Sequence, residues 1–248
     1  MICLGTRLGV QNYWNLIKYK NISQMFNAFL QLLYPKLCFA CEDPLFESEE
    51  FICTYCRISL ARVDYTQNSP WWLRAKFDGL FVYQEVQTFF IFASGGRVQH
   101  LMHAIKYKGA EDLGEYLGLW AGQSLKKSHF FHEVDCIIPI PLHPKRLQER
   151  SYNQAECIGN GLAKGLQIPI LPQALQKFSQ TNSLIGQDRS HRFEILKDSF
   201  EVLADVRGRH VLIVDDTLTT GATLLAAAEK IKAAGAKEVS FFTLAALK

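Results

Sequence analysis

The fold of this chain is decided by the stretch Val211-Leu212-Ile213-Val214-Asp215-Asp216-Thr217-Leu218-Thr219-Thr220-Gly221-Ala222-Thr223. Its first four residues are apolar and predict a buried strand of a parallel sheet, which two carboxylates follow directly. The loop of hydroxyl groups and glycine precedes a predicted helix over 224–234, and backbone N–H groups at such a helix start bind anions. The paired acids can accept hydrogen bonds from sugar hydroxyls. The stretch therefore predicts a site for a ribose 5-phosphate.

Two other phosphate-binding motifs do not fit this stretch. A Walker loop requires Gly-Lys-Ser/Thr at a fixed spacing, and a dinucleotide fingerprint requires G-x-G-x-x-G. A strand–turn–helix with incidental acids and threonines is the alternative, and the simultaneous match at every position disfavours it. The order of residues resembles the signature of the type I phosphoribosyltransferases, which bind phosphoribosyl pyrophosphate (PRPP).

A second candidate loop, over 139–147, also follows a predicted strand. It carries Lys145 and Arg146, and Arg150 comes shortly after it. Such cations suit a pyrophosphate group, which carries several negative charges. If its strand neighbours the one before Asp215, this loop faces the same crevice, because ligands of parallel sheets bind beyond the carboxyl ends of the strands. A solvated basic turn is the alternative, and the presence of the first motif favours the functional interpretation.

Strands and helices alternate along most of the chain. Strands are predicted over 77–83, 136–140, 168–171, 210–214 and 238–244, and helices over 97–107, 113–125, 153–165 and 224–234. This alternation predicts an α/β fold with a mainly parallel sheet and helices on both faces. We expect an extension over 1–24, an amphipathic helix and zinc ribbon over 25–63, a linker over 64–76 and a phosphoribosyltransferase-like domain over 77–248.

Four of the seven cysteines form two C-x-x-C pairs, Cys38 with Cys41 and Cys53 with Cys56. Each pair lets two thiolates reach one ion from a tight turn, so two pairs complete a tetrahedral structural Zn²⁺ site. A single C-x-x-C could be a redox motif, but two pairs so close together favour zinc. The odd number of cysteines fits a reducing compartment better than a disulfide framework.

Composition limits the class of protein. The net charge of +3 gives no argument for tight nucleic-acid binding. No apolar run in the sequence is long enough to cross a bilayer, and Asn15, Lys18 and Lys20 interrupt a signal-peptide pattern. We therefore expect a cytoplasmic protein that does not insert into a membrane.

The full set of motifs resembles the ComF family, named for competence proteins, in which a zinc ribbon precedes a type I phosphoribosyltransferase domain. The matching pieces are the two C-x-x-C pairs and the stretches 105–109, 139–154 and 211–223. The chain departs from the family pattern at Ser151, where glycine is usual, and at Ile195, where asparagine is common. A serine asks more of the backbone than a glycine does if its φ is positive.

The resemblance implies Mg²⁺-dependent transfer of ribose 5-phosphate from PRPP to an unknown acceptor. The backbone of 217–222 and the threonine hydroxyls would bind the 5-phosphate, the acids would bind the ribose hydroxyls, and Mg²⁺ held by PRPP would bridge the pyrophosphate. The candidate catalytic residues are Asp215, Asp216, Arg146 and Arg189. The candidate PRPP-binding residues are Asp215, Asp216, Thr217, Leu218, Thr219, Thr220, Gly221, Ala222, Thr223, Lys145, Arg146, Arg150 and Arg192. Purine-salvage relatives carry an acid where this chain has Thr219, which argues against hypoxanthine or guanine as the acceptor.

A non-catalytic accessory protein of DNA uptake, binding PRPP or a nucleotide and single-stranded DNA, is the alternative. The zinc ribbon and a set of cations and aromatics would then form the DNA groove. This set comprises Lys106, Lys108, Lys126, Lys127, Trp71 and Trp72. Ordinary solvated helix faces are the favoured explanation of the lysines. A repressor that binds PRPP is a third interpretation, and the sequence contains no helix-turn-helix signal to support it.

Overall fold

The computed structural model describes residues 35–64, 69–93, 95–126, 128, 131–178 and 199–248. The expected extension over 1–24, the amphipathic helix that follows it, Lys127, Arg189, Arg192 and Ile195 lie outside these residues. The chain divides after Arg57 into two compact units, and the domain boundaries expected from the sequence stay predictions. Within the described ranges, every helix is too short or too polar to cross a membrane.

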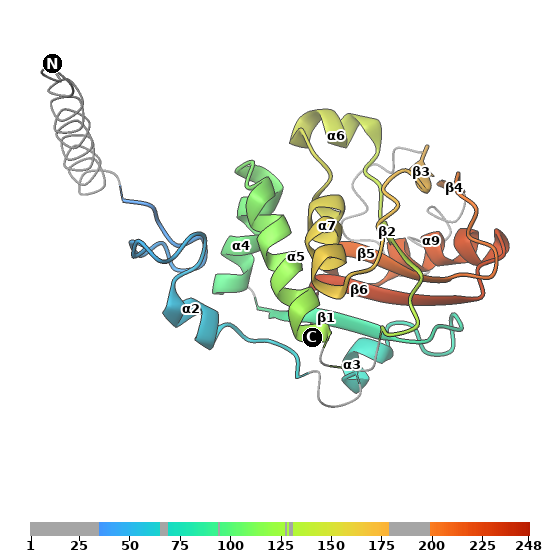
Figure 1. Cartoon of the computed structure of the whole chain (residues 1–248), viewed down its shortest axis with the longest axis horizontal. Helices are drawn as coiled ribbons and strands as arrows, with labels where there is room; N and C mark the ends of the chain where they lie inside the picture. The colour runs from blue at the N-terminus through green and yellow to red at the C-terminus, as the bar shows by residue number, and fades with distance from the viewer. Residues whose placement is uncertain (1–34, 65–68, 94, 127, 129–130, 179–198) are drawn as a thin grey trace, which may run out of the picture. The chain divides into compact units, whose positions relative to one another are not determined.

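The unit over 58–248 is built on a four-stranded parallel sheet (Figure 1). In sheet order its strands are β1 (Val86–Phe92), β6 (Glu238–Leu247), β5 (His210–Leu218) and β2 (Cys136–Pro139). In β5, Val211 and Ile213 join a core cluster with α9 (Ala222–Ala233), and the alternate Leu212 and Val214 are equally buried. Because successive side chains of a strand point to opposite faces, both faces of the sheet are covered. The expected α/β fold is confirmed.

Four helices lie close to their expected positions, namely α4 (Arg97–Tyr107), α5 (Glu111–Leu125), α7 (Gln154–Leu166) and α9. Figure 1 shows α5 and α7 side by side. A Cβ added to Gly118 of α5 would lie 2.1 Å from the carbonyl oxygen of Ile158 in α7. Only a hydrogen atom fits at that position, so the two helix backbones meet directly. This contact fixes the place of α7, whose first turn borders the candidate site.

The prediction of a strand over 77–83 is wrong. Residues 77–80 form turns, with Gly79 at φ +76°, residues 81–83 have no regular secondary structure, and the strand in this part of the chain is β1. The Phe77 ring is fully buried and stacks on Phe241 of β6, with ring centroids 4.5 Å apart. The aromatic rings of Phe77, Phe81 and Tyr83 thus pack against the sheet from outside it, whereas Leu80 and Val82 are exposed.

The strand expected over 168–171 is reduced to one bridge between Ile137 and Ile170. Pro169 and Pro172 flank that bridge and have no N–H to donate, so the ladder cannot extend. The sequence also does not predict several short elements. These are α2 (Thr54–Ser59), α3 (Trp71–Arg74), α6 (Pro144–Arg150) and the antiparallel pair of β3 (Leu175–Lys177) and β4 (Phe200–Val202).

Candidate functional site

The two acids lie at the carboxyl end of β5. The strand continues past them through Leu218, whose side chain is buried, so Thr217 and Leu218 belong to the sheet. The turn before α9 is therefore shorter than expected and covers 219–221. Gly221 adopts φ +82°, and a Cβ there would lie 3.3 Å from the Phe77 ring. The backbone conformation and the buried ring both favour glycine at the start of α9.

The basic loop reaches the same place because its strand is the neighbour of β5. β2 pairs with β5 in parallel register, and the Ile140 N–H donates to the Val214 carbonyl at 2.8 Å. The two strand ends open into one pocket, which confirms the expected juxtaposition of acids and cations. Its lining residues are Lys106, Ile140, Pro141, Leu142, His143, Arg146, Arg150, Lys177, Asp215, Asp216 and Thr223.

A lysine from α4 holds one of the acids. Lys106 Nζ lies 3.1 Å from Asp216 Oδ2 and donates to Thr217 Oγ1 at 3.2 Å. Both charged side chains are mostly buried, with 23% of Lys106 and 14% of Asp216 exposed. This position places Lys106 in the pocket and not on a solvated helix face.

The other acid sits in an environment that disfavours its charge. Burial, together with the negative charge of Asp216, raises the pKa of Asp215 to about 7. The Asp216 N–H donates to Asp215 Oδ1 at 2.8 Å. A carboxyl that changes protonation near neutral pH can both donate and accept a hydrogen bond, which suits recognition of sugar hydroxyls.

The basic loop becomes the short helix α6. His143 caps it, its Nδ1 accepting from the Lys145 N–H at 3.3 Å, and Pro144 occupies the first turn. α6 ends at Ser151, which adopts φ +68°. The positive φ considered for this residue is confirmed, and it explains why glycine suits the position. Lys145 is exposed and does not line the pocket, whereas Arg146 does.

Arg150 is held in place from two sides. Its Nη1 donates to Gln154 Oε1 at 2.9 Å, and its guanidinium lies 5.6 Å from the centroid of the Tyr107 ring. The Tyr152 hydroxyl donates to the Ile105 carbonyl, which ties this segment to α4. The structure therefore positions Arg150 at the pocket before any ligand arrives.

Three cations of this region escape prediction as site residues. Lys106 belongs to the 105–109 motif, so the motif itself could have signalled its role. Lys76 donates from Nζ to the Thr219 carbonyl at 2.7 Å, at the phosphate-loop turn. Lys177 enters the pocket from β3. Neither Lys76 nor Lys177 stands in a recognisable motif, because tertiary contacts alone bring them to the site.

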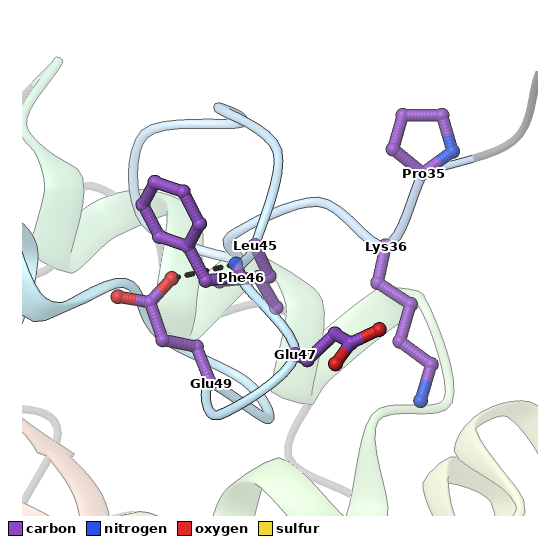
Figure 2. Close-up of a pocket in the computed structure, with 6 residues that line it drawn as sticks. All are labelled: Pro35, Lys36, Leu45, Phe46, Glu47 and Glu49. Atoms are coloured by element: carbon purple, nitrogen blue, oxygen red, sulfur yellow. Dashed lines mark hydrogen bonds between the residues drawn. The ribbon is translucent and has the colours of Figure 1, made fainter. Parts of the chain in front are cut away.

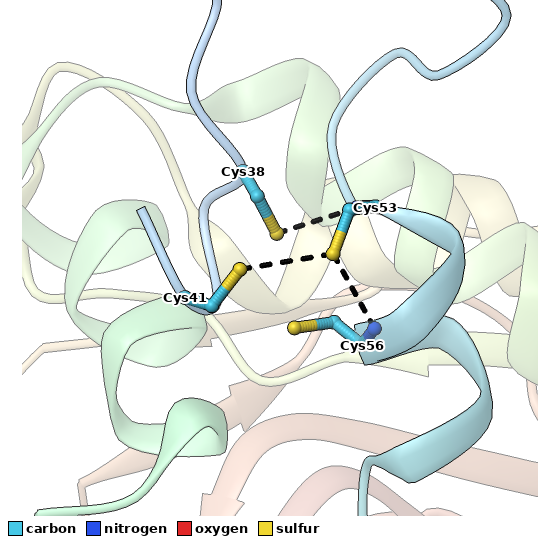
Figure 3. Close-up of side chains that lie close together, drawn as sticks. All are labelled: Cys38, Cys41, Cys53 and Cys56. Carbon is cyan, nitrogen blue, oxygen red and sulfur yellow. Dashed lines mark hydrogen bonds between the residues drawn. The ribbon is translucent and has the colours of Figure 1, made fainter. Parts of the chain in front are cut away.

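The unit before residue 58 contains a cluster of four thiols (Figure 3). The sulfurs of Cys38, Cys41, Cys53 and Cys56 all lie within 4.8 Å of one another, and those of Cys41 and Cys53 are 3.7 Å apart. Tetrahedral zinc with Zn–S bonds of about 2.3 Å separates its sulfur ligands by about 3.8 Å. The four cysteines therefore fit a zinc ion in both number and spacing.

The local backbone supports this cluster. The Cys53 N–H donates to Cys38 Sγ at 3.3 Å, and the Cys56 N–H donates to Cys53 Sγ at 3.4 Å. Burial raises the pKa of Cys41 to about 11 and raises that of Cys56 further. A bound dication would reverse these shifts, because it stabilises the thiolates directly.

Comparison with known proteins identifies a domain within the larger unit. The family model described as "Phosphoribosyl transferase domain" matches residues 154–247. The chain is 30% identical to competence protein F of Haemophilus influenzae over 50% of its own length and 56% of that protein. It is 26% identical to DNA utilization protein YhgH of Escherichia coli O157:H7, over 86% of its own length and 98% of that protein.

Two further matches extend the comparison. The chain is 27% identical to competence protein ComFC of Streptococcus pneumoniae over 62% of its own length and 66% of that protein. Among solved structures, it is similar to glutamine PRPP amidotransferase from B. subtilis, with 19% identity and a TM-score of 0.39 over 57% of this chain and 30% of that one. The chain is therefore a homologue of the competence protein F, ComFC and YhgH proteins, with a phosphoribosyl transferase domain behind a four-cysteine cluster.

Proposed function

We propose that this protein binds PRPP and transfers its ribose 5-phosphate, with Mg²⁺, to an acceptor. The observation that carries this proposal is the single pocket at the ends of β2 and β5, where two acids face several cations. PRPP has the complementary parts, a diol for the acids and a pyrophosphate for the cations. The domain match over 154–247 supports the same assignment.

In this reaction the bond between the anomeric carbon and the pyrophosphate oxygen breaks, and its electron pair stays on the pyrophosphate. A lone pair of the acceptor forms the new bond to that carbon, and the acceptor's proton passes to solvent. Asp215 and Asp216 hold the ribose hydroxyls and so fix the sugar. The turn over 219–221 and the start of α9 offer N–H groups to the 5-phosphate. Arg146 and Arg150 stabilise the charge that develops on the pyrophosphate.

Mg²⁺, bound through PRPP oxygens and water, would neutralise part of the pyrophosphate charge. The pocket residues fit such a complex, because both acids and cations line the pocket. The acids would partly compensate the charge of Mg²⁺, and the cations would partly compensate the charge of the pyrophosphate. In the cysteine unit we propose structural zinc, held by Cys38, Cys41, Cys53 and Cys56. Four protein ligands complete the tetrahedron, so this zinc would act in folding and not in the transfer reaction.

A role in DNA uptake is the second candidate, and the names of the relatives support it. Competence protein F, ComFC and YhgH, a DNA utilization protein, cover large parts of this chain. Direct binding of single-stranded DNA receives less support from the structure. Lys106 is bound to Asp216, and Trp72 is partly buried against the core, whereas Trp71 is 73% exposed.

The cysteine unit is also acidic over its described residues, 35–57. It has five carboxylates, on Glu42, Asp43, Glu47, Glu49 and Glu50, against the two cations Lys36 and Arg57. Figure 2 shows a pocket in this unit that carries Glu47 and Glu49, with the Phe46 N–H donating to Glu49 Oε2 at 2.9 Å. Such a surface repels a phosphate backbone.

The double variant Asp215→Asn/Asp216→Asn tests the proposal by titration calorimetry with PRPP and Mg²⁺. We expect binding to be abolished, while circular dichroism shows a folded protein. Asp205→Asn, which changes an exposed acid outside the pocket, is the matched control and should bind as the parent protein does. Unchanged affinity in the double variant would defeat the assignment.

Activity and DNA binding need separate assays. Pyrophosphate release from PRPP and Mg²⁺ in a metabolite extract, together with a new ribosylated mass, would identify the acceptor. Absence of any such product from a protein that binds PRPP would favour the non-catalytic candidate. For DNA, a steep loss of single-strand affinity with rising salt is the expected mark of phosphate contacts, and no binding even at low salt would exclude that role.

A further inference from the structure

Lys177 is a site cation that lies within the matched domain but in none of the motifs described above. It is the last residue of β3, in the two-stranded sheet that β3 forms with β4, and it pairs with Phe200. Its neighbour in the strand, Gln176, is exposed, whereas Lys177 is half-buried and lines the pocket with Arg146 and Asp215. The alternation of a strand thus directs Lys177 inward.

The ammonium group of Lys177 has no hydrogen bond or close ion pair with another described residue. Its Nζ lies over the Phe200 ring, 5.2 Å from the ring centroid. Burial lowers the pKa of Lys177, and the charge of Arg146 acts in the same direction, whereas Asp215 opposes them. A half-buried cation with no such partner among the described residues is unfavourable unless an anion compensates its charge, and a bound ligand can supply that anion.

The neighbours of Lys177 indicate which part of the ligand this is. Asp215 is one of the two acids proposed to hold the ribose hydroxyls, and Arg146 belongs to the basic loop that follows β2. A group that interacts with both lies between the ribose and the pyrophosphate. The 5-phosphate, by contrast, is expected at the turn over 219–221, where Lys76 already donates to the Thr219 carbonyl.

We propose that Lys177 binds the pyrophosphate of PRPP next to the anomeric carbon and stabilises it as it leaves. This inference rests on the proposed function and adds a residue to it. When the bond from the anomeric carbon to oxygen breaks, the electron pair stays on that oxygen, and the Lys177 ammonium donates a hydrogen bond to the pyrophosphate without giving up its proton. A charge-assisted bond of this kind strengthens as the negative charge grows.

The test compares three ligands by calorimetry in the full-length protein with Mg²⁺: PRPP, inorganic pyrophosphate and ribose 5-phosphate. Lys177→Gln should weaken PRPP and pyrophosphate by about 10-fold or more, the value of one lost charged hydrogen bond. Ribose 5-phosphate should change by less than about 2-fold, within ordinary context effects. Lys177→Arg should restore pyrophosphate affinity, and Gln176→Ala should leave all three ligands unchanged.

Each outcome decides a separate point. An equal loss for ribose 5-phosphate and pyrophosphate in Lys177→Gln, or no loss for either, would overturn the role of Lys177 and leave the proposed function standing. If the parent protein binds pyrophosphate but not PRPP, the proposed function fails, and a selective pyrophosphate loss in Lys177→Gln would still establish the anion contact. If the parent binds none of the three ligands, both proposals fall. Thermal unfolding of each variant, compared with the parent, separates misfolding from a local effect.

Discussion

The contact between α5 and α7 gives a quantitative test of the structure through one substitution, Gly118→Ala. A methyl group at Gly118 would lie 2.1 Å from the Ile158 carbonyl oxygen and 3.1 Å from the Leu162 nitrogen. Both obstacles are backbone atoms, so no side chain can rotate away. Relief requires the helices to separate by about 1 Å, which weakens dispersion contacts along the whole seam.

The magnitude follows from two opposing effects. Overpacking of a tight core contact destabilises by about 1–3 kcal/mol, and by more where backbone must move. Alanine in a helix interior stabilises by about 1 kcal/mol relative to glycine. Because the clash at Gly118 is severe, we expect a net loss of about 2 kcal/mol or more. That is a large part of the stability of a typical domain.

The assay is urea unfolding followed by circular dichroism, with Gly114→Ala as the matched control. Gly114 lies in the same helix, but its added Cβ would meet only side-chain atoms, of which the nearest is the Cys157 Cβ at 3.3 Å. The propensity gain is the same in both variants, so their difference isolates the helix contact. We expect Gly114→Ala to stay within about 1 kcal/mol of the parent protein. Equal stability of the two variants would refute the close approach of α5 and α7.

Three further predictions concern the acids, the thiols and the end of α6. The folded Asp215 carboxyl has a pKa of about 7, above its ordinary value of 3.8, so its contribution to stability is largest at low pH and falls as pH rises toward 7. Urea unfolding from pH 5 to 8 should show this decline in the parent protein relative to Asp215→Asn, and parallel curves of unfolding free energy against pH would contradict it. Zinc released by thiol modification should amount to one ion per chain in the parent protein and to much less in Cys56→Ser. Cys157→Ser, which changes a cysteine of α7, is the control and should release one ion per chain; equal zinc in both variants would exclude the four-thiol site. Ser151→Gly should raise the free energy of unfolding by about 0.5–1 kcal/mol. A side chain at φ +68° costs about 1–2 kcal/mol, and the greater flexibility of glycine in the unfolded chain offsets part of the gain from removing it. A loss of stability would contradict this reasoning.

Much of the sheet and one half of the site follow from sequence pattern. The apolar run before Asp215 predicts β5, and helical periodicity predicts α4, α5 and α7 closely. The four cysteines are predicted as one cluster because ligand spacing along the chain is itself the signal. In each case the deciding information is local, within a few residues of the element it describes.

The parts that escape prediction depend on contacts between distant segments. Phe77 belongs to an apolar run that resembles a strand, and only its stacking on Phe241 reveals its role outside the sheet. The sequence alone is consistent with Lys106 on a solvated helix face, and only the fold shows that its Nζ lies 3.1 Å from Asp216 Oδ2 at the end of β5. Lys177 has no motif at all, and its place depends on how β3 pairs with β4. Periodicity cannot report such contacts, because they join residues far apart along the chain.

The pocket is divided across the boundary of the matched domain, and this has a consequence for truncation. A fragment spanning 154–247 would retain both acids, the turn over 219–221 and Lys177. It would lack Lys106, Arg146 and Arg150, and it would also lack α5, on which α7 rests. Such a fragment would retain the acidic part of the site, but α7 would lack the helix against which it packs. Comparisons among homologues that begin only at residue 154 would miss these cations, which complement the charge of a polyanion.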